Sequence, residues 1–116
     1  AWKEVAERSL RPVGLIIVGT GPSEAGLKKL VTKLGLEQSV VFEPWIDLKT
    51  LYSYYKTADA FLVTSLFEGY GMSLIEAQAA GVKIISTDVG VAREVGATIA
   101  PYGHHMLAEI ILKVIS

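Results

Sequence analysis

The chain has 116 residues, a mass of 12.5 kDa and a formal net charge of −1. Its 51% hydrophobic and 20% charged residues form a globular composition, which excludes a disordered chain, and its length suits one domain with a hydrophobic core. The near-neutral charge excludes general attraction to nucleic acid or anionic membranes, and the absence of cysteine excludes disulfides and thiolate metal sites.

In chain order, helical patterns alternate with short β-branched runs, which predicts a parallel sheet covered by helices on both faces. We expect helices at Trp2–Arg8, Ser23–Leu34, Leu48–Thr57, Gly71–Ala80 and His104–Ile115, and strands at Gly14–Val18, Val40–Glu43, Ala60–Thr64, Lys83–Ser86 and Ala97–Ala100. Gly35 and Gly81 follow helical patterns and are predicted to end those helices. The predicted fold class is therefore α/β, with a doubly wound, Rossmann-like parallel sheet in a single domain. No apolar run approaches the roughly 20 residues of a membrane helix.

The first predicted element is a helix, at Trp2–Arg8. A doubly wound sheet normally begins with a strand, which lies near the middle of the sheet. We therefore expect residues 1–116 to be one domain of a longer protein, incomplete at its N-terminal strand.

The segment Ser65–Gly81 carries the clearest indication of a ligand site. It follows a predicted strand directly, and open α/β sheets bind ligands at the carboxyl ends of their strands. Gly69 and Gly71 permit a tight turn, and the helix that follows presents unpaired N–H groups and the positive end of its dipole. This arrangement predicts a site for an anion such as a diphosphate.

Glu76 is the one charged residue on that helix, and Ser73 precedes it by three residues on the same face. A helix that is otherwise apolar all round is expected to be buried, and a buried carboxylate needs hydrogen-bond donors. The residues alone leave two interpretations open. In the first, Glu76 binds sugar or ribose hydroxyls; in the second, it contacts solvent or a neighbouring loop.

Glu68 and Glu76 are separated by seven residues, and this spacing resembles the E-x7-E signature of family 4 retaining glycosyltransferases, also called group 1 glycosyl transferases. That family has the two-domain GT-B architecture. Further segments resemble it in order and spacing, namely Leu15–Pro22, Leu34–Phe42, Ala58–Val63 and Ala80–Gly90. The resemblance covers nearly all of the chain and points to the C-terminal, donor-binding domain of such an enzyme.

The resemblance implies a role for each residue of the motif. Glu68 would be catalytic, near the reacting carbon of the donor sugar, and Glu76 would bind the nucleotide ribose. The residues implied to face the sugar and the phosphates are Gly69, Tyr70, Gly71, Met72 and Ser73. The nucleobase would lie against Pro44 and Trp45, although their loop departs from the F-L-G pattern of the family. The implied function is binding of a nucleotide-sugar donor, such as a UDP- or GDP-sugar, and retaining transfer of a hexose to an acceptor.

The family also supplies diphosphate-binding cations from an R-x4-K-G motif, which has no match in this sequence. Lys28, Lys29 and Lys33 are expected to form a solvated helix face instead. We expect the cations, and the site for a sugar, lipid or small-molecule acceptor, in an N-terminal domain outside this sequence. The isolated chain is then not expected to turn over. The sequence predicts no metal, no cofactor beyond the donor substrate, and a cytoplasmic or peripherally membrane-associated protein.

Two alternatives belong to other classes. One is a non-catalytic nucleotide- or nucleotide-sugar-binding module of the same fold. The other is an NAD-dependent oxidoreductase, because Gly19 and Gly21 follow a strand as in the G-x-G-x-x-G motif. Glu24, however, stands where the third glycine of that motif belongs.

His104 and His105 are predicted to be exposed residues at a helix start, with no visible nucleophile or metal partner.

Overall fold

The computed structural model describes residues 1–18, 22–44, 46–65 and 72–115. Helices and strands alternate along these residues, in the order α1 (Trp2–Arg8), β1 (Leu15–Val18), α2 (Glu24–Lys33), β2 (Val40–Glu43), α3 (Leu48–Thr57), β3 (Phe61–Val63), α4 (Met72–Ala80), β4 (Ile84–Ser86), β5 (Thr98–Ile99) and α5 (His104–Ile115). Every predicted helix and strand is present, and each boundary lies within one residue of its predicted position. The α/β class is confirmed.

All described strand pairs are parallel, and the strands form two separate sheets. β1 pairs with β2, and β4 lies between β3 and β5. β1 and β3 share no ladder hydrogen bonds, because no strand within the described residues lies between them. The two sheets are therefore connected through helices and loops.

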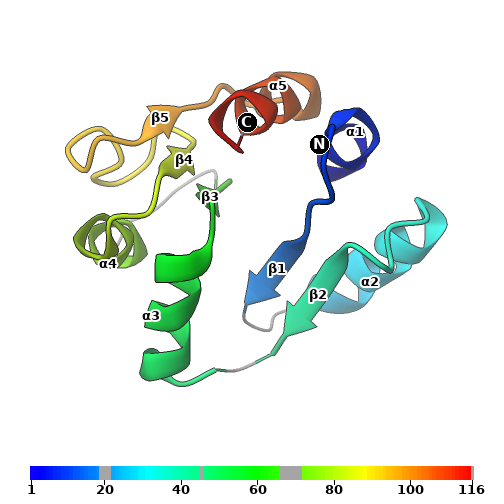
Figure 1. Cartoon of the computed structure of the whole chain (residues 1–116), viewed down its shortest axis with the longest axis horizontal. Helices are drawn as coiled ribbons and strands as arrows, with labels where there is room; N and C mark the ends of the chain where they lie inside the picture. The colour runs from blue at the N-terminus through cyan, green and yellow to red at the C-terminus, as the bar shows by residue number, and fades with distance from the viewer. Residues whose placement is uncertain (19–21, 45, 66–71, 116) are drawn as a thin grey trace.

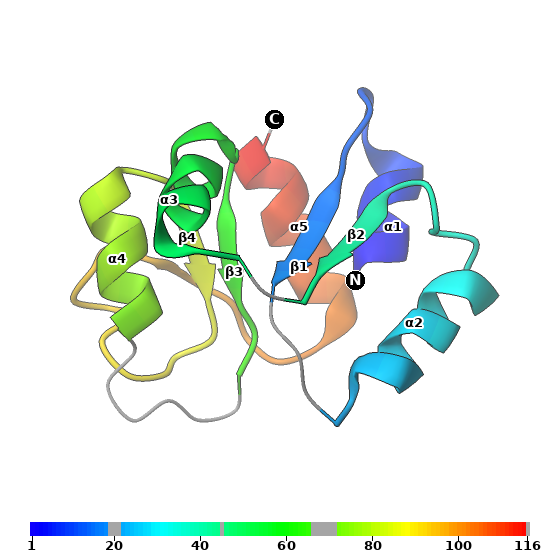
Figure 2. The ribbon, with the colours of Figure 1, turned by 90° about the horizontal axis from the view of Figure 1, so that it is seen from below.

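Figure 1 shows the helices in two layers, with α1, α2 and α5 on one side of the strands and α3 and α4 on the other. In Figure 2 the arrows of β1, β2, β3 and β4 point the same way. The carboxyl ends of these strands therefore lie along one edge of the molecule, and that is the edge at which a ligand site is expected.

The hydrophobic core consists of two clusters, one on each side of β4. Ile84 packs with buried residues of α3, β3 and α4, whereas Ile85 packs with buried residues of α1 and α5. Neighbouring residues of a strand point to opposite faces, so β4 supplies both clusters. The buried hydrophobic residues of the two clusters are Val5, Tyr55, Val63, Leu74, Ala77, Ile84, Ile85, Val89, Ala92, Ala100, Ala108 and Ile111.

Helix α4 is only partly buried, and the expectation that it is covered all round is wrong. Leu74 and Ala77 are fully buried, but Gln78 and Ala79 are exposed. α4 lies in an outer layer, so it packs on one side against β4 and α3. Its predicted end is confirmed, because Gly81 has a φ of 83° and donates its N–H to carbonyls of the last turn.

None of the helices in the described part of the chain combines the length and the apolar composition needed to cross a bilayer.

Candidate functional site

The candidate site lies where α4 begins, at the carboxyl edge of the parallel strands (Figure 2). Met72 opens the helix, Ser73 is half-buried in the first turn, and Glu76 is half-buried one turn further on. The structure therefore places these three predicted residues on one helix. Glu68, Gly69, Tyr70 and Gly71 lie outside the described residues, as do Trp45 and the side chain of Met72.

Tyr55, which is buried on α3, senses the charge of Glu76. Burial raises the pKa of Tyr55, and the negative charge of Glu76 raises it further. Tyr55 is itself fixed by an edge-to-face contact with Phe61, whose ring centroid lies 5.1 Å away. Within the described ranges, the side chain of Glu76 makes no hydrogen bond or ion pair. Its oxygens are thus available to donors from outside this part of the chain.

Thr87, which was not among the predicted site residues, links the ends of β3 and β4 next to the site. The hydroxyl of Thr87, just after β4, donates a 2.6 Å hydrogen bond to the carbonyl oxygen of Ser65, just after β3. The backbone N–H of Thr87 also donates to the carbonyl of Val63, at 3.0 Å. Thr87 is only 5% exposed, so these bonds are sheltered from water. They fix the position of Ser65, three residues before Glu68 in the sequence. The sequence feature that could have indicated this role is the position of Thr87 directly after a predicted strand.

The loop after β4 is closed by an ion pair. Both carboxylate oxygens of Asp88 accept hydrogen bonds from the Arg93 guanidinium, each at 3.0 Å. The charge of Asp88 is thus neutralised within the loop. Pro44, predicted to contact a base, is exposed at the end of β2.

A cation-lined cavity among the described residues lies away from this edge. It has a volume of about 390 Å³ and is lined in part by Arg11, Lys56, Asp59 and Lys83, at the amino ends of β3 and β4. Open α/β sheets bind ligands at the opposite, carboxyl edge, so this cavity is not assigned to the candidate site.

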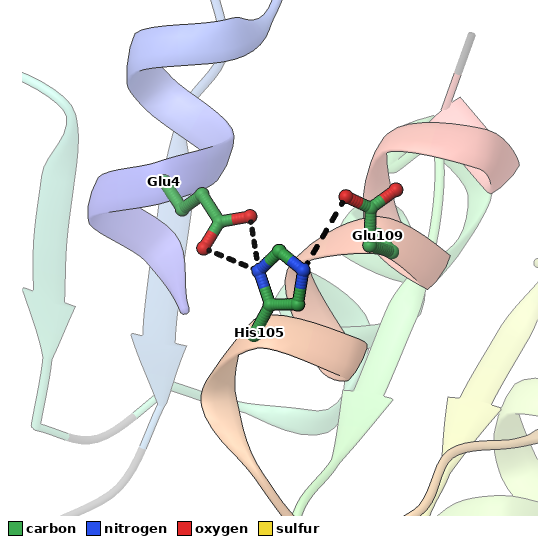
Figure 3. A group of neighbouring side chains, drawn as sticks. All are labelled: Glu4, His105 and Glu109. Atoms are coloured by element: carbon green, nitrogen blue, oxygen red, sulfur yellow. Dashed lines mark hydrogen bonds and ion pairs between the residues drawn. The ribbon is translucent and has the colours of Figure 1, made fainter.

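A second group of side chains joins α1 to α5 (Figure 3). The Nδ1 atom of His105 lies 3.1 and 3.0 Å from the two carboxylate oxygens of Glu4, and its Nε2 atom lies 3.9 Å from Glu109. These three residues have the chemistry and the proximity to hold a metal ion. Arg8, however, already donates to both carboxylates, at 2.8 Å to Glu4 and 2.5 Å to Glu109.

Because Arg8 occupies the space between the carboxylates and neutralises them, we assign the group as an electrostatic link between helices. Its hydrogen bonds lower the pKa values of two carboxyl groups. The bond with His105, and then that with Arg8, lowers the pKa of Glu4, and the bond from Arg8 lowers the pKa of Glu109. His104 and His105 are exposed at the start of α5, as predicted.

Comparison with known proteins gives a family match over the whole chain. Residues 1–116 match the family described as "Glycosyl transferases group 1". An uncharacterized glycosyltransferase of Methanocaldococcus jannaschii is 36% identical over 76 residues, which cover 66% of this chain and 20% of that protein. A D-inositol 3-phosphate glycosyltransferase of Nocardia farcinica is 37% identical over 86 residues, which cover 69% of this chain and 19% of that protein.

A solved structure has the same fold. Sucrose-phosphate synthase from Thermosynechococcus elongatus superposes with a TM-score of 0.80 at 27% identity, over 97% of this chain and 32% of that one. The chain thus spans about a fifth of the length of the curated relatives, and it matches the C-terminal part of a GT-B fold.

We predict that Thr87→Val destabilises the chain by about 1 kcal/mol, because a buried hydrogen bond is lost while the side-chain shape is kept. Urea unfolding followed by circular dichroism measures this change. Thr98→Val is the matched control, since Thr98 is exposed on β5 and should change the free energy of unfolding by less than about 0.5 kcal/mol. Equal effects in both variants would contradict the assigned role of Thr87.

We predict that Glu4→Gln flattens the acid side of the stability profile. A carboxyl whose folded pKa is lowered stabilises the protein above its unfolded pKa, near 4.5 for Glu4, and this contribution is lost as the pH falls through the folded pKa. Urea midpoints measured between about pH 6 and pH 3 should fall less steeply in Glu4→Gln than in the unchanged chain. The control is Glu7→Gln, on the same helix and 3.9 Å from Lys3. An unchanged slope in Glu4→Gln would show that the link to α5 contributes nothing.

Proposed function

The chain belongs to the group 1 glycosyl transferases, and from this premise we propose that it binds a nucleotide-sugar donor for retaining transfer of a hexose to an acceptor. The observation that carries the proposal is the position of Ser73 and Glu76 on α4, at the carboxyl edge of the sheet, in a chain that matches this family over its whole length. Both side chains are half-buried and lie on one face of the helix.

In this proposal Glu76 accepts hydrogen bonds from the ribose hydroxyls of the donor. Hydrogen bonds to a charged acceptor are stronger than neutral ones, and a half-buried carboxylate without a partner in the described residues is a suitable acceptor. The proposed nucleobase position, against Pro44 and Trp45, is at the end of the neighbouring strand.

The diphosphate is proposed to lie at the amino end of α4. The first four N–H groups of a helix have no partner inside the helix, and its dipole favours negative charge there. The backbone from Gly69 to Ser73 would then face the phosphates and the sugar. The hydrogen bond from Thr87 to Ser65 supports this role, because it fixes the residue from which the chain continues toward Gly69.

The chemistry follows from where charge develops. As the bond between the anomeric carbon and the diphosphate oxygen breaks, negative charge grows on the diphosphate and positive charge grows on the sugar ring. Helix amides stabilise the first charge without reorganising, and a carboxylate at Glu68 would stabilise the second. The acceptor hydroxyl oxygen then forms the new glycosidic bond to the anomeric carbon, and its proton passes to the departing diphosphate. No metal is assigned to this site.

Other parts of the reaction are proposed to depend on residues outside these 116. The relatives are about five times as long as the matched region, so the acceptor site and the cations for the diphosphate have room elsewhere. The name of the Nocardia farcinica relative mentions inositol 3-phosphate, which carries hydroxyl groups. We propose a sugar, lipid or small-molecule acceptor, a cytoplasmic or membrane-peripheral enzyme, and no turnover by the isolated chain.

The donor site is tested by calorimetric titration with UDP, GDP, ADP and NAD. One nucleoside diphosphate should bind, and Glu76→Ala should weaken it by about 1–3 kcal/mol, roughly 5- to 150-fold in Kd, because a charged hydrogen bond is lost. Gln78→Ala is the matched control, since Gln78 is exposed on the same helix. Binding of NAD alone, or an unchanged Kd in Glu76→Ala, would overturn the proposal.

The catalytic role is tested in the longer protein. Glu68→Gln should lower kcat by about 100-fold or more and leave the donor KM within a few-fold, because the carboxylate is proposed to act on charge that develops in the transition state. Glu94→Gln is the control, as Glu94 is an exposed carboxylate after β4. If kcat is unchanged in Glu68→Gln, Glu68 is not the catalytic carboxylate.

A further inference from the structure

A cavity at the amino edge of the strands lies apart from the proposed donor site. It has a volume of about 390 Å³, and segments far apart in the sequence build its wall. Residue 11 precedes β1, residues 55, 56, 58 and 59 lie at and just after the end of α3, residues 80–83 lead from α4 to β4, and residues 114 and 115 end α5. Figure 2 shows these segments on the side from which the strand arrows start. The proposed sugar transfer uses the opposite edge and leaves this cavity without a role.

Three cationic side chains share this cavity with one carboxylate. The cations are Arg11, Lys56 and Lys83, and the carboxylate is Asp59. Among the residues that the structure describes, none of the three cations forms an ion pair with Asp59 or with another carboxylate. Three positive charges thus stand against one negative charge, in a chain whose net charge is −1. The excess of positive charge in the wall attracts anions to the cavity.

The guanidinium of Arg11 is held in place by the main chain of α5. It donates a hydrogen bond to the carbonyl oxygen of Ile115, in the last turn of that helix. A guanidinium has five N–H donors in a planar fork, so this bond leaves donors for a bidentate contact with an anion such as phosphate. Arg11 is therefore positioned at the cavity before a ligand binds.

Helix ends explain part of this positive charge, but they do not explain its arrangement. Lys56 lies in the last turn of α3 and Arg11 contacts the last turn of α5, where the helix dipole favours cations. Lys113 has the same advantage on α5 and does not line the cavity. Lys83 directly precedes β4, and the N–H of Gly81 already bonds to carbonyls of the last turn of α4. Lys83, and the meeting of three cations at one cavity, are accounted for by an anionic ligand.

The size and the chemistry of the wall indicate the class of ligand. Pockets for small molecules measure roughly 300–1,000 Å³, and this cavity lies within that range. A phosphomonoester carries a charge of about −1.5 to −2 near pH 7, which matches the excess positive charge of the wall. Two residues of the wall offer acceptors, namely the carboxylate of Asp59 and the backbone carbonyl of Ala80, which accepts no hydrogen bond within the described ranges. Acceptors beside cations suit a ligand that carries hydroxyl groups as well as a phosphate.

We propose that this cavity binds the phosphomonoester of a phosphorylated polyol, with Arg11, Lys56 and Lys83 on the phosphate and Asp59 on a hydroxyl group. A soluble polyol phosphate and the headgroup of a lysophospholipid share this chemistry. The site is separate from the donor site, and the proposal does not depend on the function proposed for that site.

The test is calorimetric titration of the longer protein with glycerol 3-phosphate, a small phosphorylated polyol. Lys83→Gln should raise the Kd about 10-fold, because a hydrogen bond to a charged group is lost, and Lys56→Gln combined with Lys83→Gln should raise it about 100-fold. Lys29→Gln is the matched control, since Lys29 is exposed on α2, outside the cavity, and its replacement removes the same charge. It should leave the Kd within about 2-fold, because exposed charges at a distance are screened by salt.

Three results would overturn the proposal. One is the absence of saturable binding of glycerol 3-phosphate, and another is an equal change of Kd in Lys83→Gln and Lys29→Gln. The third is loss of binding when a nucleoside diphosphate is added in excess or when Glu76 is replaced by alanine, because the ligand would then occupy the donor site. Failure of the donor proposal alone would leave the effect of Lys83→Gln unchanged.

The source of the ligand is distinguished by sedimentation with vesicles. Vesicles of phosphatidylcholine with added lysophosphatidate present a glycerol phosphate group on a surface, and Leu10, beside Arg11 in the sequence, is fully exposed. Sedimentation that requires lysophosphatidate, and that is lost when Lys56 and Lys83 are both replaced by glutamine, would identify a lipid headgroup. Saturable binding of glycerol 3-phosphate without such sedimentation would identify a soluble ligand. Either result supports the proposed site.

Discussion

Parallel strand pairing is the constraint on which the rest of this molecule depends. A parallel strand must start at the same edge as its neighbour, so the chain returns across the sheet after each strand, usually as a helix. This requirement accounts for the alternation of helices and strands along the described residues. It also collects the carboxyl ends of the strands at one edge, and the segments that leave that edge carry the candidate site.

β4 shows how the same constraint builds the core. As the central strand of its sheet it is buried on both faces, and consecutive residues serve different layers. Ile84 supports α3 and α4, whereas Ile85 supports α1 and α5. The layer on which the site depends is therefore anchored to the same three-residue strand as the layer that carries the link between Glu4, Arg8 and His105.

Helix α4 connects packing to chemistry through a spacing of three residues. Leu74 and Ala77 are fully buried and hold the helix against the core, while Ser73 and Glu76 each precede one of them. Neighbouring positions on a helix lie about 100° apart, so the anchored face fixes the direction of the polar one. Glu76 is half-buried as a result, and the hydrogen bond from Thr87 to the Ser65 carbonyl links the ends of β3 and β4.

The helices, the strands and the family could be predicted from the sequence. Periodicity and turn residues are local properties, so helix and strand boundaries followed from them to within one residue, and the spacing of Glu68 and Glu76 led to a family that the comparison confirmed. Three features appeared only in the folded molecule: the division of the strands into two sheets, the covering of α4 on one side, and the contact of Glu4 with His105 across 101 positions of sequence. These features depend on which distant segments pack together. Local periodicity carries no information about contacts between residues that are far apart in the sequence.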